Sequence, residues 1–451
     1  MIHPWLGIAG VLGALVGLFA ALWVVKRWLG APPELLRKLM HVGMGLVVLT
    51  FPWVFHQQWP VTLLVATAVI GMLFVRFVPR LRDGIGTILN SVQRPSLGEI
   101  YFPLSVGIVF WWSERDKLLY CVPMLIMILA DATAALIGIA YGKVKYVTSE
   151  GLKSAEGSIA FFSIAFLSVH VPLLLYTDVG RTQTLLVAII IGILAMLLEA
   201  IAWRGLDNLL IPIGALLFLN LYLDASVDDL VLRLIVTIAL LIFALSWRRR
   251  SSLDDSALMT AALFGYGAWM LGGPLWLVGP GVLFVVQVVM WPRIGEQRKT
   301  TVFAILSVVS AALLWLGLYV HDAQDLYLIA YAVTFGVHLA IMGVSRVELD
   351  WPIALQVRRL GAWVLAGAML AVLQVIAFSF THDARAHVPS LPVTGVSLVG
   401  VALGAGLFFL VRPSLYTRHR RPAIIHTAGF VTGIVGALVA MLLCALASGA
   451  V

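Results

Sequence analysis

The sequence contains little charge and very little cysteine. Of its 451 residues, 12% are charged, whereas an average soluble domain carries about a quarter. The two cysteines, Cys121 and Cys444, lie inside apolar runs and lack the spacing of a metal motif or a disulfide framework. We expect both to be small buried hydrophobic residues. The low charge excludes an ordinary water-soluble domain.

Apolar runs dominate the rest of the chain. Runs of roughly 17 to 25 residues can span a bilayer as helices, which satisfy their own backbone hydrogen bonds. The short alternating segments of a β-barrel do not occur. The sequence therefore predicts an all-α, polytopic transmembrane protein with about sixteen spans. The predicted spans are 5–25, 40–56, 59–77, 99–112, 117–141, 158–176, 183–203, 208–223, 228–246, 256–271, 274–292, 301–320, 324–344, 359–379, 390–411 and 422–447.

The basic residues predict the orientation of these spans. Lys26 and Arg27 follow the first apolar run, which is typical of a first membrane helix with its N-terminus outside and not of a signal peptide. All but five of the 30 lysines and arginines then belong to cytoplasmic loops or helix ends. This bias explains the net charge of +8 by topology and contact with anionic lipids, without a nucleic-acid partner. The five exceptions are Arg115, Lys117, Arg181, Arg233 and Arg385.

Polar clusters occur where even-numbered spans of the first half begin, on the predicted cytoplasmic side. The clusters are "RKLMHVG", "RPSLGEIYFP", "KSAEGS" and "RGLDN". A helix N-terminus presents free N–H groups and partial positive charge, which favours phosphate. His41 shares a helix face with two cations, which favours an anion contact over a metal site. We expect nucleotide contacts from Arg37, Lys38, His41, Lys143, Asp207 and Asn208, and substrate contacts from Glu99 and Tyr101.

Two carboxylates, Asp131 and Glu199, lie within predicted spans. An ionisable group inside a span is costly, so a functional site is the first expectation. A packing role is the alternative for either acid, and Glu199 is close enough to a helix end to extend toward water. Basic groups that bind phosphates, together with acids that hold Mg²⁺, are what phosphoryl or nucleotidyl transfer requires.

The segment "GKVKYVTSEGLKSAEGS", residues 142–158, is either a solvated connector or an anion-binding loop. Lys153 supplies a charge suited to phosphate, and Gly157 allows close approach of the backbone. Its glycines are too sparse for a Walker A loop. Together with the other basic helix starts, it favours anion binding.

Five stretches resemble the polyprenol kinase family, which includes dolichol kinase and phytol kinase and is related to CTP-using phosphatidate cytidylyltransferases. In order, they are "RKLMH", "GEIYFP", "ADATAALIGIAYGKVKY", "KSAEGSIAFF" and "EAIAWRGLDNLLIP", within residues 30–225. The resemblance implies metal-dependent transfer of the terminal phosphate of a nucleoside triphosphate, usually CTP, to a long-chain isoprenoid alcohol. It places Asp131 and Gly138 in the active site, and Lys153, Ser154, Glu156, Gly157 and Ser158 at the nucleotide phosphates.

The expected catalytic residues are therefore Asp131, Lys153 and Glu199, with Mg²⁺ on Asp131 and Glu156. Whether Asp131 is a metal ligand or a general base stays open. We expect the lipid alcohol to enter from the membrane and the nucleotide from the cytoplasm, with the protein in the inner membrane of a bacterium and its active site facing the cytoplasm.

The two halves of the chain differ in their polar content. Residues 1–225 form the kinase-like membrane domain, whereas residues 226–451 have no membrane-embedded carboxylate and form a second membrane domain of unknown role. There, Gln287, His338 and Gln374 are expected to make interhelical hydrogen bonds. A lipid cytidylyltransferase and a proton-coupled transporter are the alternative functions. The confinement of polar residues to one half and one face argues against the transporter.

Overall fold

A computed structural model of the chain describes residues 3–77, 97–148, 151–248, 250–290, 301–345, 351–379, 390–418 and 422–447. The protein is an all-α polytopic membrane protein, as predicted. Each of the predicted spans coincides with a helix or a bent helical segment. Within the described residues, twelve helices are long and apolar enough to cross a membrane, and Asp207–Leu223 and Pro274–Met290 are shorter apolar helices. The total of sixteen spans remains a prediction.

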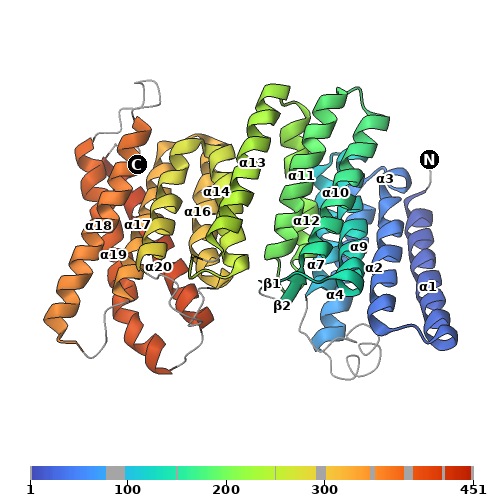
Figure 1. The fold of residues 1–451 in the computed structure, drawn as a ribbon, viewed down its shortest axis with the longest axis horizontal. Helices are drawn as coiled ribbons and strands as arrows, with labels where there is room; N and C mark the ends of the chain where they lie inside the picture. The colour runs from blue at the N-terminus through green and yellow to red at the C-terminus, as the bar shows by residue number, and fades with distance from the viewer. Residues whose placement is uncertain are drawn as a thin grey trace. The chain divides into compact units, whose positions relative to one another are not determined.

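The chain folds into two compact units, Met1–Ala239 and Leu240–Val451. Each is a bundle of helices (Figure 1). The sequence-based division at residue 225 concerns function and remains a prediction. Unit 1 contains α1 (Pro4–Leu29), α2 (Pro33–Leu49), α3 (Phe51–Val54), α4 (Gln58–Phe77), α7 (Gly98–Trp112), α8 (Lys117–Leu125), α9 (Asp131–Tyr141), α10 (Ala155–Tyr176), α11 (Arg181–Ile201), α12 (Asp207–Leu223) and the first part of α13 (Val227–Trp247).

Unit 2 is built around α17, the most buried of the candidate spans. Close contacts between glycines let its helices approach one another, because a Cβ at Gly400 would lie 2.7 Å from the carbonyl oxygen of Gly436. The helices of this unit are the remainder of α13, α14 (Asp255–Gly272), α15 (Val278–Met290), α16 (Val302–Asp322), α17 (Asp325–Val344), α18 (Ile353–Ser379), α19 (Ser390–Arg418) and α20 (Pro422–Ala447), with a 3₁₀ turn, η2 (Pro274–Leu277).

The buried polar residues of unit 2 do not pair as predicted. His338 Nδ1 bonds the carbonyl oxygen of Thr334, 2.8 Å away in the same helix. Gln287 Nε2 donates to Ser252 Oγ at 3.1 Å, which links α15 to the segment before α14. Among the described residues, His338 Nε2 and both amide atoms of Gln374 have no hydrogen-bond partner. The prediction of interhelical bonds is therefore wrong for His338 and Gln374.

Two helices of unit 1 begin earlier than the hydrophobic pattern predicts. α2 begins at Pro33, because a proline fits the first turn of a helix, where its missing N–H would have no partner. Arg37 and Lys38, which precede the predicted span 40–56, therefore lie within the helix, and His41 lies near its middle and not at its start. α10 begins at Ala155, because the Ser154 side chain accepts a hydrogen bond from Gly157 N and caps the helix.

The helix that carries Asp131 contains a wide turn. Residues Ile126–Ala130 form a π-helical segment, η1, between α8 and α9. Pro123 lies in the last turn of α8, and it removes a backbone N–H from the helical ladder. Single π turns inside α-helices are frequent at functional sites. Asp131 is the first residue after this turn.

The connector between α9 and α10 contains the two strands found among the described residues. β1 (Lys145–Thr148) and β2 (Gly151–Ser154) pair antiparallel, with Tyr146 opposite Lys153 and Val147 opposite Leu152. Thr148 Oγ1 donates to the carbonyl oxygen of Gly151 at 2.9 Å. Gly151 has φ 125, a conformation that only glycine adopts readily. The expected loop is thus an ordered hairpin.

Candidate functional site

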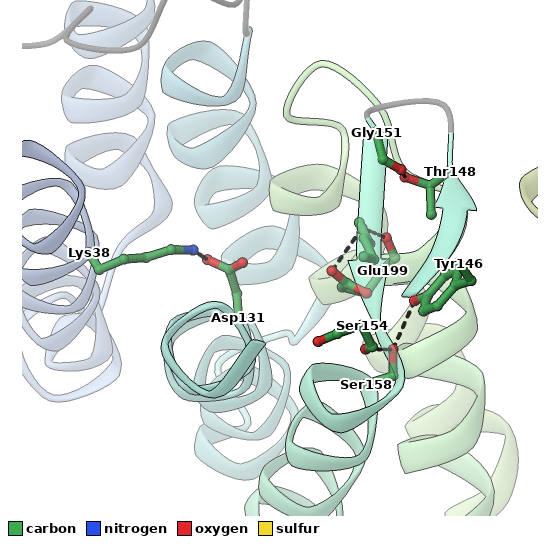
Figure 2. Close-up of polar contacts among 9 residues, drawn as sticks. Lys38, Asp131, Tyr146, Thr148, Gly151, Ser154, Ser158 and Glu199 are labelled. Atoms are coloured by element: carbon green, nitrogen blue, oxygen red, sulfur yellow. Dashed lines mark hydrogen bonds and ion pairs between the residues drawn. The ribbon is translucent and has the colours of Figure 1, made fainter. Parts of the chain in front are cut away.

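A buried ion pair joins α2 to the start of α9. Lys38 Nζ lies 2.7 Å from Asp131 Oδ2, and the two side chains are 6% and 18% exposed. Figure 2 shows the lysine extended from its helix to the carboxylate. Both residues belong to apolar helices of membrane-spanning length, where an unpaired charge is costly. Lys38 and Asp131, which were predicted separately as site residues, therefore neutralise each other's charge.

His41 lies one turn after Lys38 on the same face of α2 and completes this group. Its Nε2 is 3.3 Å from the carbonyl oxygen of Met127 and 3.7 Å from Asp131 Oδ2. Because a carbonyl oxygen only accepts, the geometry places the ring proton on Nε2. The Met127 carbonyl belongs to the π turn, and the Phe102 ring packs edge-on at 5.5 Å. The π turn thus helps to orient the histidine.

A second ion pair joins the hairpin to the end of α11. Lys153 Nζ donates to Glu199 Oε1 at 2.8 Å and to the Glu199 carbonyl oxygen at 2.5 Å. Burial lowers the pKa of Lys153, but the charge of Glu199, the hydrogen bond to it and the nearby Asp207 outweigh burial and raise the pKa above its ordinary value. Lys153 is therefore a cation at neutral pH.

The hydroxyl groups of this region form a short chain at the start of α10. Tyr146 OH and Ser158 Oγ are 2.8 Å apart, and Ser158 Oγ donates to the carbonyl oxygen of Ser154 at 3.2 Å. Figure 2 shows Tyr146 and Ser158 meeting beside the hairpin. Ser154 Oγ accepts from Gly157 N at 3.2 Å. Two of the expected phosphate ligands, Ser154 and Ser158, thus support the hairpin and the helix cap.

Three glycines let α9 and α10 pack closely. A Cβ on Gly157 would lie 3.0 Å from the carbonyl oxygen of Ala134 and 3.3 Å from the Cα of Gly138, and a Cβ on Gly138 would lie 3.1 Å from Ser154 Oγ. A Cβ on Gly142 would meet the Gly138 carbonyl oxygen and Ser154. Gly138 and Gly157 therefore pack against the opposite helix. Asp131 and Gly138 are separated by about 10 Å along α9, so the same helix carries the first ion pair and the glycine contact with α10.

The other predicted nucleotide ligands have different surroundings. Glu156 accepts hydrogen bonds from Val144 N at 3.2 and 3.3 Å, so its carboxylate closes the start of the hairpin. Lys143 and Arg37 are exposed. Arg37 lies close enough to Asp131 to act on it electrostatically.

The starts of α7 and α12 are joined by hydrogen bonds. Leu97 N donates to the carbonyl oxygen of Arg204 at 2.8 Å, and Asn208 Nδ2 lies 3.5 Å from the carbonyl oxygen of Gly98. The neighbouring Asp207 acts on Lys153 electrostatically. Glu99 and Tyr101, the predicted substrate contacts, occupy the first turn of α7.

The donor set for Mg²⁺ is small. Among the described residues, no group of three or more His, Cys, Asp or Glu side chains lies together as a preformed metal cage. Mg²⁺ is usually held by one or two carboxylates together with substrate phosphates. Asp131 next to basic groups fits that arrangement, whereas Glu156 already caps the hairpin. The residues thus fit a metal that arrives with a nucleotide.

Sequence reasoning missed Tyr146, Phe102 and the Met127 carbonyl. The alternation in "KYVT" followed by Gly151 was a signal for the hairpin, and it would have placed Tyr146 opposite Lys153. The π turn has no comparable signal besides Pro123. The two pairings, Lys38 with Asp131 and Lys153 with Glu199, join residues that were predicted individually.

These observations define an all-α membrane protein whose first unit holds two ion pairs between neighbouring helices. The chain is 33% identical over 219 residues to a phytol kinase from Synechocystis sp., an alignment that covers 47% of this chain and 90% of that relative. The chain therefore belongs to the phytol kinase family. No family model matches the sequence. No solved structure matches it either.

Proposed function

We propose that the protein transfers the terminal phosphate of CTP, or of another nucleoside triphosphate, to a long-chain isoprenoid alcohol such as phytol, geranylgeraniol or a polyprenol. The observation that carries the proposal is the Lys38–Asp131 ion pair, with His41 beside it, between apolar helices of a member of the phytol kinase family. A lipid alcohol can present its hydroxyl there from within the membrane. The choice of CTP rests on the sequence resemblance.

The proposed reaction needs charge neutralisation and a proton acceptor. The alcohol oxygen attacks the terminal phosphorus, the bond to the bridging oxygen breaks, and the nucleoside diphosphate leaves. Lys38, Arg37 and Lys153 offset the negative charge on the phosphates. Asp131 is the carboxylate at the reacting hydroxyl and either accepts its proton or holds the metal. His41, whose Nε2 bonds the Met127 carbonyl oxygen, lies 3.7 Å from Asp131 Oδ2 and lines the site beside this carboxylate.

Asp131 would hold Mg²⁺, and Glu156, the second acid predicted from the sequence, would have to leave its hydrogen bonds to Val144 N to join it. Bound there, the ion would offset the negative charge that develops on the transferred group. The basic loops support an active site at the cytoplasmic face of a bacterial inner membrane. Lys153 is cationic whether or not the metal is bound, because the negative charge of Glu199 raises the pKa of the lysine.

The test is a transfer assay with purified protein in liposomes, Mg²⁺, γ-labelled CTP and a panel of isoprenoid alcohols. We expect label in a lipid monophosphate, and its loss in Asp131→Asn and in Lys153→Ala. Ser163→Ala is the matched control, because the exposed Ser163 bonds only within α10. This variant should retain the wild-type rate.

Two other results would overturn the proposal. Incorporation of α-labelled CTP into phosphatidate, without transfer of the γ label, would identify a lipid cytidylyltransferase. Proton-coupled uptake that is lost in Asp131→Asn and independent of any nucleotide would identify a transporter.

A further inference from the structure

The hairpin between α9 and α10 has two chemically different faces. Directly opposite residues of an antiparallel pair project to the same side. Tyr146 and Lys153 face the site described above. Lys145, Val147 and Leu152 lie on the other face, and Val147 and Leu152, which are paired, are 43% and 69% exposed. We call this second set, with Lys143, the outer face. Ser154, opposite Lys145, is the buried end of this face, where the hairpin meets α10.

Short connections keep the hairpin near the membrane surface. Three residues, 142–144, separate α9 from β1, and α10 begins directly after β2. Three extended residues reach at most about 10 Å, and the interfacial layer beyond the hydrocarbon is about 5–8 Å thick on each side. Figure 2 shows the strands running from Gly151 and Thr148 to Ser154, next to Ser158 at the start of α10. The hairpin thus lies across the ends of two candidate membrane spans.

The surroundings of the outer face match an anionic lipid surface. Ile139 and Tyr141 at the end of α9 and Ile159 at the start of α10 are 70%, 67% and 63% exposed, so apolar surface continues from the spans to the hairpin. The exposed Lys143 and Lys145 add positive charge at the same level. Paired apolar groups next to lysines are typical of elements that lie in the headgroup layer.

We infer that the outer face of the hairpin docks on the anionic lipid surface of the membrane that holds the protein, with Val147 and Leu152 at the acyl boundary and Lys143 and Lys145 among the headgroups. The opposite face then holds Lys153 against Glu199 at the membrane surface. This inference does not depend on the reaction proposed above, because it concerns the position of the hairpin.

The test uses spin labels in the full chain, reconstituted in lipid nanodiscs. Cys121 and Cys444 are first replaced by serine. Single cysteines are then placed at Leu152, at the lipid-facing reference Ile70 of α4, and at the aqueous reference His321, whose side chain is 84% exposed. Collision with oxygen and with a water-soluble nickel chelate reports the depth of each label.

We expect the Leu152 label to meet the nickel chelate severalfold less often than the His321 label, and to meet oxygen nearly as often as the Ile70 label. The protection of the Leu152 label from the nickel chelate should be greater in nanodiscs that contain phosphatidylglycerol than in nanodiscs of phosphatidylcholine alone. Lys143→Gln with Lys145→Gln should remove this difference between the lipids. Both lysine side chains are exposed, and thermal unfolding of the variant in detergent checks that the loss of the Lys145 charge near Glu156 leaves the fold intact.

Two results would overturn the inference. Equal nickel access at Leu152 and His321 in both lipids would place the outer face in water. Low access to both reagents would show that protein, from this chain or a second copy, covers it. Neither result would affect the transfer assay, so the two proposals fail independently.

Discussion

Lys38 and Asp131 form the most buried ion pair among the described residues. Removing one member of such a pair leaves an uncompensated charge, which costs about 3–5 kcal/mol. We predict that Lys38→Met and Asp131→Asn each lower the free energy of unfolding by about that amount, and that the double variant loses much less than the sum. Denaturant titration in detergent micelles, analysed as a double-mutant cycle, measures this coupling.

Lys117 provides the control for that cycle, because Lys117→Met removes only an exposed cation–π contact with Trp53 and should cost at most about 1 kcal/mol. Additive losses in the double variant would mean that Lys38 and Asp131 do not stabilise each other.

The Lys153–Glu199 pair predicts a dependence on alkaline pH. The folded-state pKa of Lys153 is above its ordinary value of 10.5. The pair therefore stabilises fully below that pH and is lost as the pH rises through the folded-state pKa. Glu199→Gln should cost about 2 kcal/mol near neutral pH, as expected for a charge-assisted hydrogen bond. Wild type and variant should converge in stability as the pH rises above 10.5.

Thermal unfolding in detergent at a series of pH values measures this effect. Glu114→Gln, at the exposed turn before α8, is the matched control. A constant difference between wild type and Glu199→Gln up to the highest pH would contradict the ionic account.

At this scale the sequence identified the right residues but not their partners. Asp131 and Glu199 were recognisable because a carboxylate in an apolar run is costly. Their partners lie far away in sequence, since Lys38 is 93 residues from Asp131. Pairing over such a distance depends on helix packing, which periodicity does not reveal.

At the scale of elements, the contact between α9 and α10 depends on glycine. A Cβ at Gly142, at the end of α9, would meet Ser154 at the start of α10 and the backbone carbonyl oxygen of Gly138 in its own helix. Gly142→Ala should therefore destabilise the protein by about 1–3 kcal/mol, as overpacking does. Gly71→Ala, in α4, has nothing within 4 Å and should be neutral or slightly stabilising. Denaturant titration in detergent micelles measures the free energy of unfolding of the two variants. Equal values for Gly142→Ala and Gly71→Ala would contradict the packing argument.

Helix positions followed from the apolar runs, but several helix starts did not. Pro33 and Ser154 begin α2 and α10 before the hydrophobic pattern does. Proline and capping residues act locally, and an apolar window averages over them. The hairpin was missed for a related reason, because a loop rich in lysine and serine looks solvated unless its alternation is examined.

At the scale of the whole molecule, the positive-inside bias predicts the topology. Lys143 precedes the hairpin on the predicted cytoplasmic side, and Asp178 lies in the predicted outer loop between α10 and α11. In a background with Cys121→Ser and Cys444→Ser, a membrane-impermeant thiol reagent should label Asp178→Cys in intact cells. It should label Lys143→Cys only after permeabilisation. The reverse pattern would invert the topology and move the candidate site to the other side.

The π turn before Asp131 has a consequence for how this helix tolerates insertions and deletions. The helix contacts α2 on both sides of this turn, because Tyr120 OH donates to the carbonyl oxygen of Val48 at 2.9 Å before it and Asp131 pairs with Lys38 after it. A π turn holds one more residue than an α turn, and removing one residue rotates everything beyond it by about 100°. Loss of a single codon between these two contacts would keep the hydrophobicity of the span and still turn one of them away from α2. In this stretch the number of residues is therefore under tighter constraint than their chemical nature.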